Sequence, residues 1–224
     1  MIIGITGGIG SGKSTIARAL AARGYAVYDC DKEAKRIIAE NKDVQQQIIN
    51  LFGEKSFVNG VYNTQYISKC VFSPSLQGRS GEALLAQLNA IIHPAVKEDI
   101  CQQALPAICQ QSGLSAKRSV SKAVLFIESA ILYEAGLDSL CDKIIVVEAP
   151  EDIRIARTIA RDYHGDASPE NINKVRARIK AQGGLSIQHS EVSIQDSEVR
   201  LIVNNDGKTS VAELADEIQN WLKK

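Results

Sequence analysis

The chain has 224 residues, of which 45% are hydrophobic and 23% charged, enough for one α/β domain with insertions or for two small domains. Its 26 basic and 26 acidic residues cancel, so the basic excess typical of nucleic-acid-binding proteins is absent. The five cysteines form no C-x-x-C pair, and no run approaches the about 20 apolar residues of a membrane span. We therefore expect a reduced cytoplasmic protein with no signal peptide, zinc site, disulfide framework, nucleic-acid partner or membrane partner.

A glycine-rich segment, residues 4–15, follows the short apolar run at the start of the chain. From Gly7 to Ser14 it satisfies G-x-x-x-x-G-K-[ST], the phosphate loop whose backbone N–H groups cradle nucleotide phosphates. In such a loop Lys13 reaches the outer phosphates and the Ser14 hydroxyl ligates Mg²⁺. The helix behind the loop directs the positive end of its dipole at the same anion. The predicted phosphate-binding residues are Gly8, Ile9, Gly10, Ser11, Gly12, Lys13, Ser14 and Thr15.

The residues around the loop fit that interpretation. A strand is predicted over 2–6 and an amphipathic helix over 14–22, the order that a phosphate loop requires. The dinucleotide-binding pattern G-x-G-x-x-G begins with Gly8 and Gly10, but Lys13 stands in its last place. The motif therefore favours a phosphate loop over a dinucleotide-binding turn.

Apolar runs typical of buried parallel strands alternate with helical stretches along the rest of the chain. The predicted strands cover 25–28, 123–127, 143–147 and 201–203. The predicted helices include a stretch through Ile38 and the ranges 43–52, 82–92, 94–108 and 210–222, with a polar link over 117–122. This alternation predicts an α/β fold, a P-loop NTPase-type three-layer arrangement with a central parallel sheet, a helical substrate-binding insert and a helical lid.

The spacing of these elements also predicts how the chain is divided. We expect a nucleotide-binding core from 1–29, 120–150 and 199–224, a helical acceptor domain over 30–119 and a lid region over 151–198. A large helical insert after the second strand is typical of small-molecule kinases rather than of switch GTPases. The chain also lacks the guanine-binding motif N-K-x-D.

Carboxylates follow two of the predicted strands, at the edge where open parallel sheets bind ligands. Asp29 and Asp31 come after the second strand, and phosphoryl transfer needs a carboxylate to orient the attacking hydroxyl and take its proton. Capping of the next helix is the alternative for either aspartate. Lys35, one turn after Asp31, makes a substrate contact or a plain surface ion pair. Glu128 ends a buried strand, either as an Mg²⁺ ligand or as a polar strand end.

Three arginines and one histidine complete the candidate set. Arg154, Arg157 and Arg161 are spaced i, i+3, i+7, so on a helix they form one basic stripe. Such a stripe repels itself unless an anion such as a triphosphate lies between the guanidinium groups; a solvated face is the alternative. Asp162 either locks Arg161 or caps the helix. His93, before Pro94, is either structural or a substrate contact.

Several of these segments together resemble one family, the dephospho-coenzyme A kinases. The phosphate loop matches that family nearly letter for letter, and the other matches follow in the family's order over almost the whole chain. They are residues 29–35 (D-A-D-x-x-A-R), 88–94 (L-x-x-I-x-H-P), 128–136 (D-x-P-L-L-F-E-S-G), 157–162 (R-x-x-x-R-D), Gln182 (R-I-x-x-Q) and 204–207 (N-x-G).

The resemblance implies ATP-dependent phosphorylation of the ribose 3′-hydroxyl of dephospho-CoA, giving CoA and ADP, the last step of CoA biosynthesis. It implies ATP and dephospho-CoA as substrates and Mg²⁺ as the cofactor. We also expect a monomer or weak homo-oligomer. By position, the implied roles are catalysis by Asp31, Lys13 and Arg161, ATP binding by Arg157, acceptor binding by Asp29, Lys35, His93 and Glu134, and Mg²⁺ binding by Ser14 and Glu128.

The sequence departs from the family pattern at positions that bear on the acceptor and the adenine pocket. Lys35 replaces an arginine, which keeps the charge but loses the bidentate fork. Thr64 stands where an arginine is common, Glu128 replaces an aspartate and Ala130 a proline; the stretch Gly183–Glu198 is longer than usual. Two alternatives stay open: another nucleoside monophosphate or small-molecule kinase, and a non-catalytic P-loop protein that binds nucleotide and signals.

Overall fold

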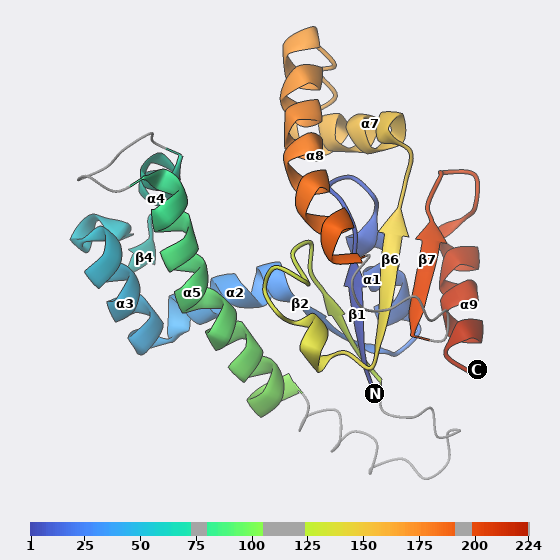
Figure 1. Cartoon of the computed structure of the whole chain (residues 1–224), viewed down its shortest axis with the longest axis horizontal. Coiled ribbons are helices and arrows are strands. Elements are labelled where there is room, and N and C mark those ends of the chain that lie inside the picture. The colour runs from blue at the N-terminus through green and yellow to red at the C-terminus, as the bar shows by residue number, and fades with distance from the viewer. Residues whose placement is uncertain (73–79, 105–123, 191–198, 224) are drawn as a thin grey trace. The chain divides into compact units, whose positions relative to one another are not determined.

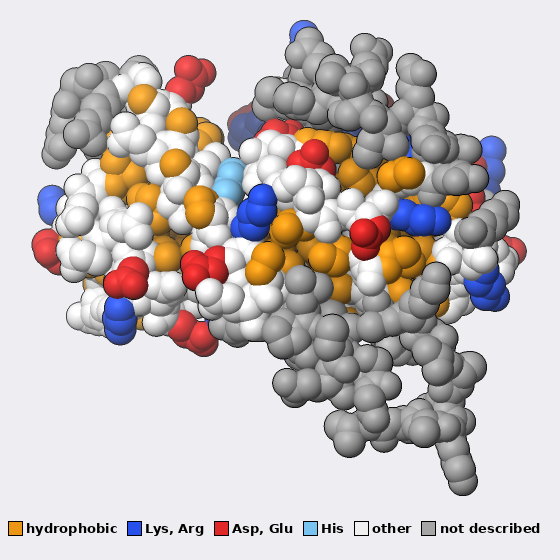
Figure 2. All heavy atoms as spheres, turned by 60° about the horizontal axis from the view of Figure 1, so that its bottom comes forward, with side chains coloured by type: hydrophobic (Ala, Val, Ile, Leu, Met, Phe, Trp, Pro, Cys, Tyr) orange, Lys and Arg blue, Asp and Glu red, His pale blue; other side chains and the backbone are white. Residues whose placement is uncertain are grey.

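The computed structural model describes residues 1–72, 80–104, 124–190 and 199–223 (Figure 1). The chain forms two compact units, one made of Met1–Asp29 with Ala107–Lys224 and the other of Cys30–Pro106. Within the described ranges, no helix is long and apolar enough to cross a membrane. On the face that Figure 2 shows, acidic and basic side chains are scattered among one another, in line with the balanced composition.

The first unit is built on a five-stranded sheet in which every neighbouring pair is parallel. Its strands lie in the order β2-β5-β1-β6-β7. They are β1 (Ile2–Thr6), β2 (Ala26–Asp29), β5 (Leu125–Glu128), β6 (Lys143–Glu148) and β7 (Arg200–Asn204). The parallel sheet confirms the predicted fold class. It also brings the strand ends that carry the loop and the carboxylates to one edge.

Two helices close the main core against the sheet. α1 (Lys13–Ala22) contributes Ile16 and Leu20, and α9 (Val211–Trp221) contributes Leu214 and Ile218, to a cluster that includes the strand residue Phe126. Burying each such side chain stabilises the fold by roughly 1.5–3 kcal/mol. α9 begins with a complete capping box formed by its N-cap serine and the glutamate three residues on.

A helix pair, α7 (Glu151–Asp162) and α8 (Pro169–Ser190), follows β6. It has an apolar cluster of its own, formed by Ile159, Val175 and Ile179 and separate from the main core. Both helices fall in the region predicted as a lid, whose assignment stays a prediction. α8 includes the first eight residues of the long stretch Gly183–Glu198, and 191–198 lie outside the described residues.

The second unit is mostly helical, as predicted for the insert. Its helices are α2 (Cys30–Glu40), α3 (Lys42–Phe52), α4 (Thr64–Val71) and α5 (Gly81–Asp99), followed by a π-helical turn, Ile100–Ala104. A 3-10 turn (Glu54–Ser56) and a short hairpin of β3 (Phe57–Val58) and β4 (Val61–Tyr62) join α3 to α4. The side chains of Asn41, Asn63 and Ser80 cap α3, α4 and α5, so local sequence sets where these helices begin. Thr64 is the first residue of α4.

α5 corrects one expectation from the sequence. Pro94 was expected to separate two helices, but α5 runs unbroken through it (Figure 1). A proline inside a helix removes one backbone hydrogen bond and costs about 3 kcal/mol. The buried side chains of Leu84 and Leu88 before the proline and Val96 after it offset that cost. The polar link over 117–122, and the end of the helix expected to reach Ile108, lie outside the described residues.

Candidate active site

The phosphate loop between β1 and α1 needs glycine for two reasons. Gly10 and Gly12 have φ angles of 75° and 95°, in the left-handed region that side chains disfavour. Space is also lacking: a Cβ on Gly12 would lie 2.2 Å from Asn205 Nδ2, and one on Gly10 would lie 2.4 Å from the Arg154 carbonyl oxygen. Side-chain and backbone atoms of residues far away in the sequence therefore leave no room for a side chain at these two positions.

Three side chains outside the loop donate to its carbonyl oxygens; we call Arg154, Arg157 and Asn205 the loop brace. Arg154 Nε donates to the Ile9 carbonyl at 2.8 Å, and Asn205 Nδ2 and Arg157 Nη1 donate to the Ser11 carbonyl at 2.8 and 3.2 Å. Arg157 Nη2 also donates to Asn205 Oδ1 at 3.0 Å. In a planar trans peptide the N–H of the next residue points the opposite way. The brace therefore turns the following N–H groups away from itself, toward the other side of the loop.

The predicted arginine stripe divides between two environments. Arg157 lies against the loop, as does Arg154, whereas Arg161 donates two hydrogen bonds to Asp162 and is 62% exposed. Asp162 also accepts from Arg178 at 2.8 Å. Hydrogen bonds from Arg161 and then Arg178 lower the pKa of Asp162 to about 2. Asp162 thus holds Arg161 in place, one of the two roles expected for it, and the catalytic role of Arg161 stays a prediction.

The side chains predicted for the outer phosphates and the metal lie at the start of α1 and at the end of β5. Lys13 is only 8% exposed, and its Nζ lies 3.4 Å from the Gly8 carbonyl oxygen. Ser14 Oγ donates to Glu128 Oε1 at 3.3 Å, so the two predicted Mg²⁺ ligands do meet. Asp29 is the register partner of Glu128 in the parallel β2–β5 pair, which puts both on one face at one sheet edge.

A hydroxyl and two carboxylates are oxygen ligands of the kind that Mg²⁺ binds. The described residues contain no group of three or more His, Cys, Asp or Glu side chains able to hold a metal by themselves. Mg²⁺ commonly uses one or two carboxylates and completes its shell with water and substrate phosphates. The set formed by Ser14, Glu128 and Asp29 therefore fits Mg²⁺ held together with a nucleotide.

Two polar contacts to the loop were not foreseen. Asn205 is 4% exposed and belongs to the brace, and Gln182 Oε1 accepts from the Ile9 N–H at 2.6 Å. Both positions fall in motifs that the resemblance covers, N-x-G and R-I-x-x-Q, but those motifs gave them no role. Only tertiary contacts bring them to the loop.

Most of the predicted acceptor residues lie in the second unit, whereas Asp29 ends β2 in the first unit as the register partner of Glu128. Asp31 and Lys35 are exposed and lie one turn apart on α2, as their spacing predicts, so Asp31 is a helical residue rather than a cap. His93 is partly buried in α5. Glu134 belongs to the first unit and is partly buried in the turns after β5. Their contact with an acceptor stays a prediction.

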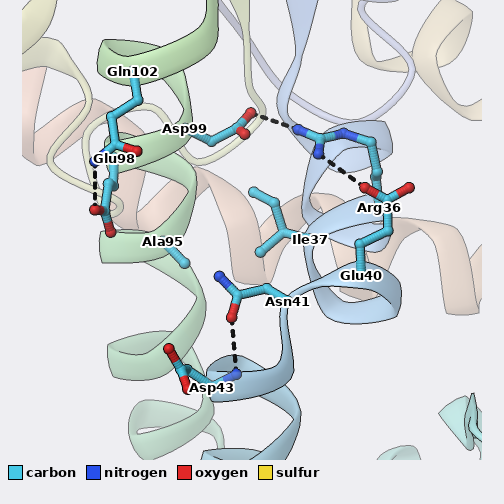
Figure 3. Close-up of a pocket in the computed structure, with 9 residues that line it drawn as sticks. All are labelled: Arg36, Ile37, Glu40, Asn41, Asp43, Ala95, Glu98, Asp99 and Gln102. Atoms are coloured by element: carbon cyan, nitrogen blue, oxygen red, sulfur yellow. Dashed lines mark hydrogen bonds and ion pairs between the residues drawn. The ribbon is translucent and has the colours of Figure 1, made fainter.

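The helical unit also contains a cavity of about 360 Å³ between α2, α3 and α5 (Figure 3). Arg36 lies at its edge and donates to Asp99 at 2.7 Å, to Glu33 at 2.5 Å and to Glu40 at 3.2 Å. These carboxylates raise the pKa of Arg36. Asp43 and Glu98 add further acidic side chains to the lining. The acidic lining disfavours a phosphate group, and the ion pair between Arg36 and Asp99 joins α2 to α5.

Comparison with known proteins decides the family. The family model for dephospho-CoA kinase matches residues 1–210. The chain belongs to the dephospho-CoA kinase family. The curated dephospho-CoA kinase of Porphyromonas gingivalis is 43% identical over 160 residues, covering 71% of this chain and 69% of the relative. That of Fusobacterium nucleatum is 39% identical over 175 residues, 78% of this chain and 80% of the relative.

A solved structure agrees with the fold over the full length. A crystal structure from Thermus thermophilus is 26% identical and has a TM-score of 0.68, covering 100% of this chain and 96% of that one. The dephospho-CoA kinase family catalyses the last step of CoA biosynthesis, a kinase reaction. The alternative of another nucleoside monophosphate or small-molecule kinase is not favoured. The resemblance inferred from the motifs is thereby confirmed.

Proposed function

We propose that this chain transfers the γ-phosphate of ATP to the ribose 3′-hydroxyl of dephospho-CoA with the residues described above, giving CoA and ADP. The observation that carries the proposal is the contact between Ser14 and Glu128 beside a phosphate loop whose carbonyl groups the brace holds, in a member of this family. Phosphoryl transfer depends mostly on positioning and charge stabilisation, and the loop supplies both.

On the ATP side, the backbone N–H groups of Gly8–Thr15 bind the phosphates and Lys13 neutralises charge on the transferred group. Arg157 supports ATP binding through the loop carbonyls that it holds, and its positive charge attracts the same anion from the far side of the loop. Ser14 and Glu128 would hold Mg²⁺ together with Asp29, which the resemblance assigns to the acceptor. The ion would supply positive charge that neutralises the negative charge developing on the phosphates.

On the acceptor side, Asp31 orients the 3′-hydroxyl and accepts its proton, and the oxygen attacks in line. Lys35, His93 and Glu134 contact the rest of dephospho-CoA. Arg161 leaves Asp162 for the phosphates when the lid closes, and closure excludes water and so limits wasteful ATP hydrolysis. The exposure of Arg161 supports this exchange, because an exposed ion pair is weak.

The proposed division of labour follows the expected domains: core 1–29, 120–150 and 199–224, acceptor domain 30–119 and lid 151–198. The enzyme acts in the cytoplasm as a monomer or weak homo-oligomer, with ATP and dephospho-CoA as its partners and without nucleic acid.

The test is ADP formation with ATP, Mg²⁺ and a panel of acceptors containing dephospho-CoA, nucleoside monophosphates and shikimate. We expect turnover with dephospho-CoA and little with the others. Asp31→Asn should lower kcat at least a hundredfold while the dissociation constant for ATP changes little, as expected for loss of a general base. Near-normal turnover of Asp31→Asn would refute the base assignment, and absence of ADP with dephospho-CoA would refute the proposed function.

A further inference from the structure

Ile9, in the phosphate loop, has both of its backbone polar groups engaged by the helix pair α7 and α8. Its carbonyl oxygen accepts from Arg154 of α7 at 2.8 Å, and its N–H donates to Gln182 Oε1 of α8 at 2.6 Å. Gln182 Nε2 in turn donates to the Ala130 carbonyl, after β5, at 3.4 Å. One carboxamide therefore joins α8, the phosphate loop and the segment that follows Glu128.

A bound anion would act differently on the two contacts of Ile9. Its carbonyl oxygen is an acceptor that phosphate oxygens do not approach, so the Arg154 contact is compatible with a bound nucleotide. Its N–H is a donor in the loop whose backbone amides cradle phosphates. Gln182 Oε1 accepts from that donor, so a phosphate oxygen competes with Gln182 for the same hydrogen.

The chemistry of glutamine suits such an exchange. A carboxamide is neutral and carries both an acceptor oxygen and two N–H donors. It satisfies a backbone donor when no phosphate is present, and after a half-turn of the amide it donates to a phosphate oxygen. A carboxylate at this position would accept from Ile9 equally well but would repel the phosphates.

We propose that Gln182 is a nucleotide-contacting and positioning residue of this kinase. It accepts from the Ile9 N–H in the nucleotide-free chain, and it donates its NH₂ group to a phosphate oxygen once ATP occupies the loop. This inference rests on the proposed function, because it needs ATP as the ligand of the loop.

The exchange also links nucleotide binding to the helix pair. α8 is joined to α7 through the apolar cluster of Ile159, Val175 and Ile179. α7 contacts the loop through Arg154, and α8 contacts it through Gln182. A bound phosphate displaces only the contact of Gln182. The position of α8 relative to the loop therefore depends on which partner the carboxamide has.

The test compares Gln182→Ala and Gln182→Glu in the full chain, with Lys180→Ala, an exposed residue of the same helix, as the matched control. Calorimetric titration with a non-hydrolysable ATP analogue gives the dissociation constant, and steady-state kinetics at saturating dephospho-CoA give kcat and KM for ATP. We expect Gln182→Ala to weaken analogue binding about tenfold, the loss of one hydrogen bond to a charged group. Gln182→Glu should weaken it further, and the control should match the unaltered chain.

Gln182→Ala separates a phosphate contact from a merely structural one. If Gln182 only held the Ile9 N–H, Gln182→Ala would release that donor to the phosphates and would bind the analogue as tightly as the unaltered chain or more tightly; that result would overturn the inference. Normal binding by both variants would overturn it too. Failure of the unaltered chain to bind the analogue or to form ADP from dephospho-CoA would overturn the proposed function, and this inference with it.

Discussion

Arginine side chains have different structural roles in the two units. In the first unit, Arg154 and Arg157 donate to backbone carbonyls of the phosphate loop and so shape a binding surface made of main chain. In the second unit, Arg36 donates to Glu33 and Glu40 of its own helix and to Asp99 of α5, and the pair with Asp99 joins the two helices. The same side chain therefore prepares a ligand site in one unit and stabilises packing in the other. The comparison predicts that polar substitutions change ATP binding in the first unit and folding stability in the second.

Removing Lys13 should have the largest effect, because its ammonium is expected to stabilise charge on the phosphate in transit. We expect Lys13→Ala to lower kcat by about a thousandfold, the size seen when one preorganised charge-stabilising donor is lost. Steady-state ADP formation measures this effect, and circular dichroism should show an unchanged fold. Lys208→Ala, an exposed lysine of the same unit, is the control. Retention of a tenth of the activity would refute the role of Lys13.

Asn205 tests the loop brace. Asn205→Ala removes a donor from the Ser11 carbonyl and an acceptor from Arg157, so the loop should lose its shape. We expect a loss of about 1–3 kcal/mol in the free energy of unfolding and a higher KM for ATP. Urea unfolding and kinetics measure the two effects. Asn204→Ala, the exposed neighbour, should change neither. A normal KM for ATP in Asn205→Ala would show that the brace does not shape the phosphate site.

Asp99 tests the other side of the comparison. Asp99→Asn removes the most buried carboxylate paired with Arg36. We expect the free energy of unfolding to fall by about 1–2 kcal/mol, less than for a fully buried pair because Arg36 is 32% exposed. The dissociation constant for ATP should stay unchanged, which calorimetry checks, and Glu98→Gln is the exposed control. Weaker ATP binding by Asp99→Asn would contradict the prediction that polar substitutions in the second unit change folding stability and leave ATP binding unchanged.

The smallest effect should come from Asp162 and depend on pH. Its pKa is about 2 in the folded chain against an ordinary 3.8, so its pairing stabilises the fold above about pH 4 and is lost as the pH falls toward 2. The difference in melting temperature between the unaltered chain and Asp162→Asn should therefore be constant from pH 7 to 5 and narrow below pH 4. A difference that grows as the pH falls would contradict this sign.

Sequence and structure agree where the determinants are local. The phosphate loop, the parallel strands and the pairing of Ser14 with Glu128 all follow from short motifs and from the rule that strand ends meet at one sheet edge. Gln182 could not be assigned that way, because it reaches the loop from within a helix and no strand end places it there. Asn205 directly follows the parallel strand β7, so the strand-end rule could have found it. Pro94 shows the opposite error: the local rule predicted a helix end, and buried apolar side chains on both sides of it prevailed.

The central claim is transfer of the γ-phosphate of ATP to the 3′-oxygen of dephospho-CoA. ATP that carries a radiolabel in its γ-phosphate reports this transfer directly. The account predicts that the label appears in CoA, that one ADP forms for each CoA, and that a 3′-specific phosphatase releases the label. Label found only in inorganic phosphate, or in a product that the phosphatase does not cleave, would contradict the account.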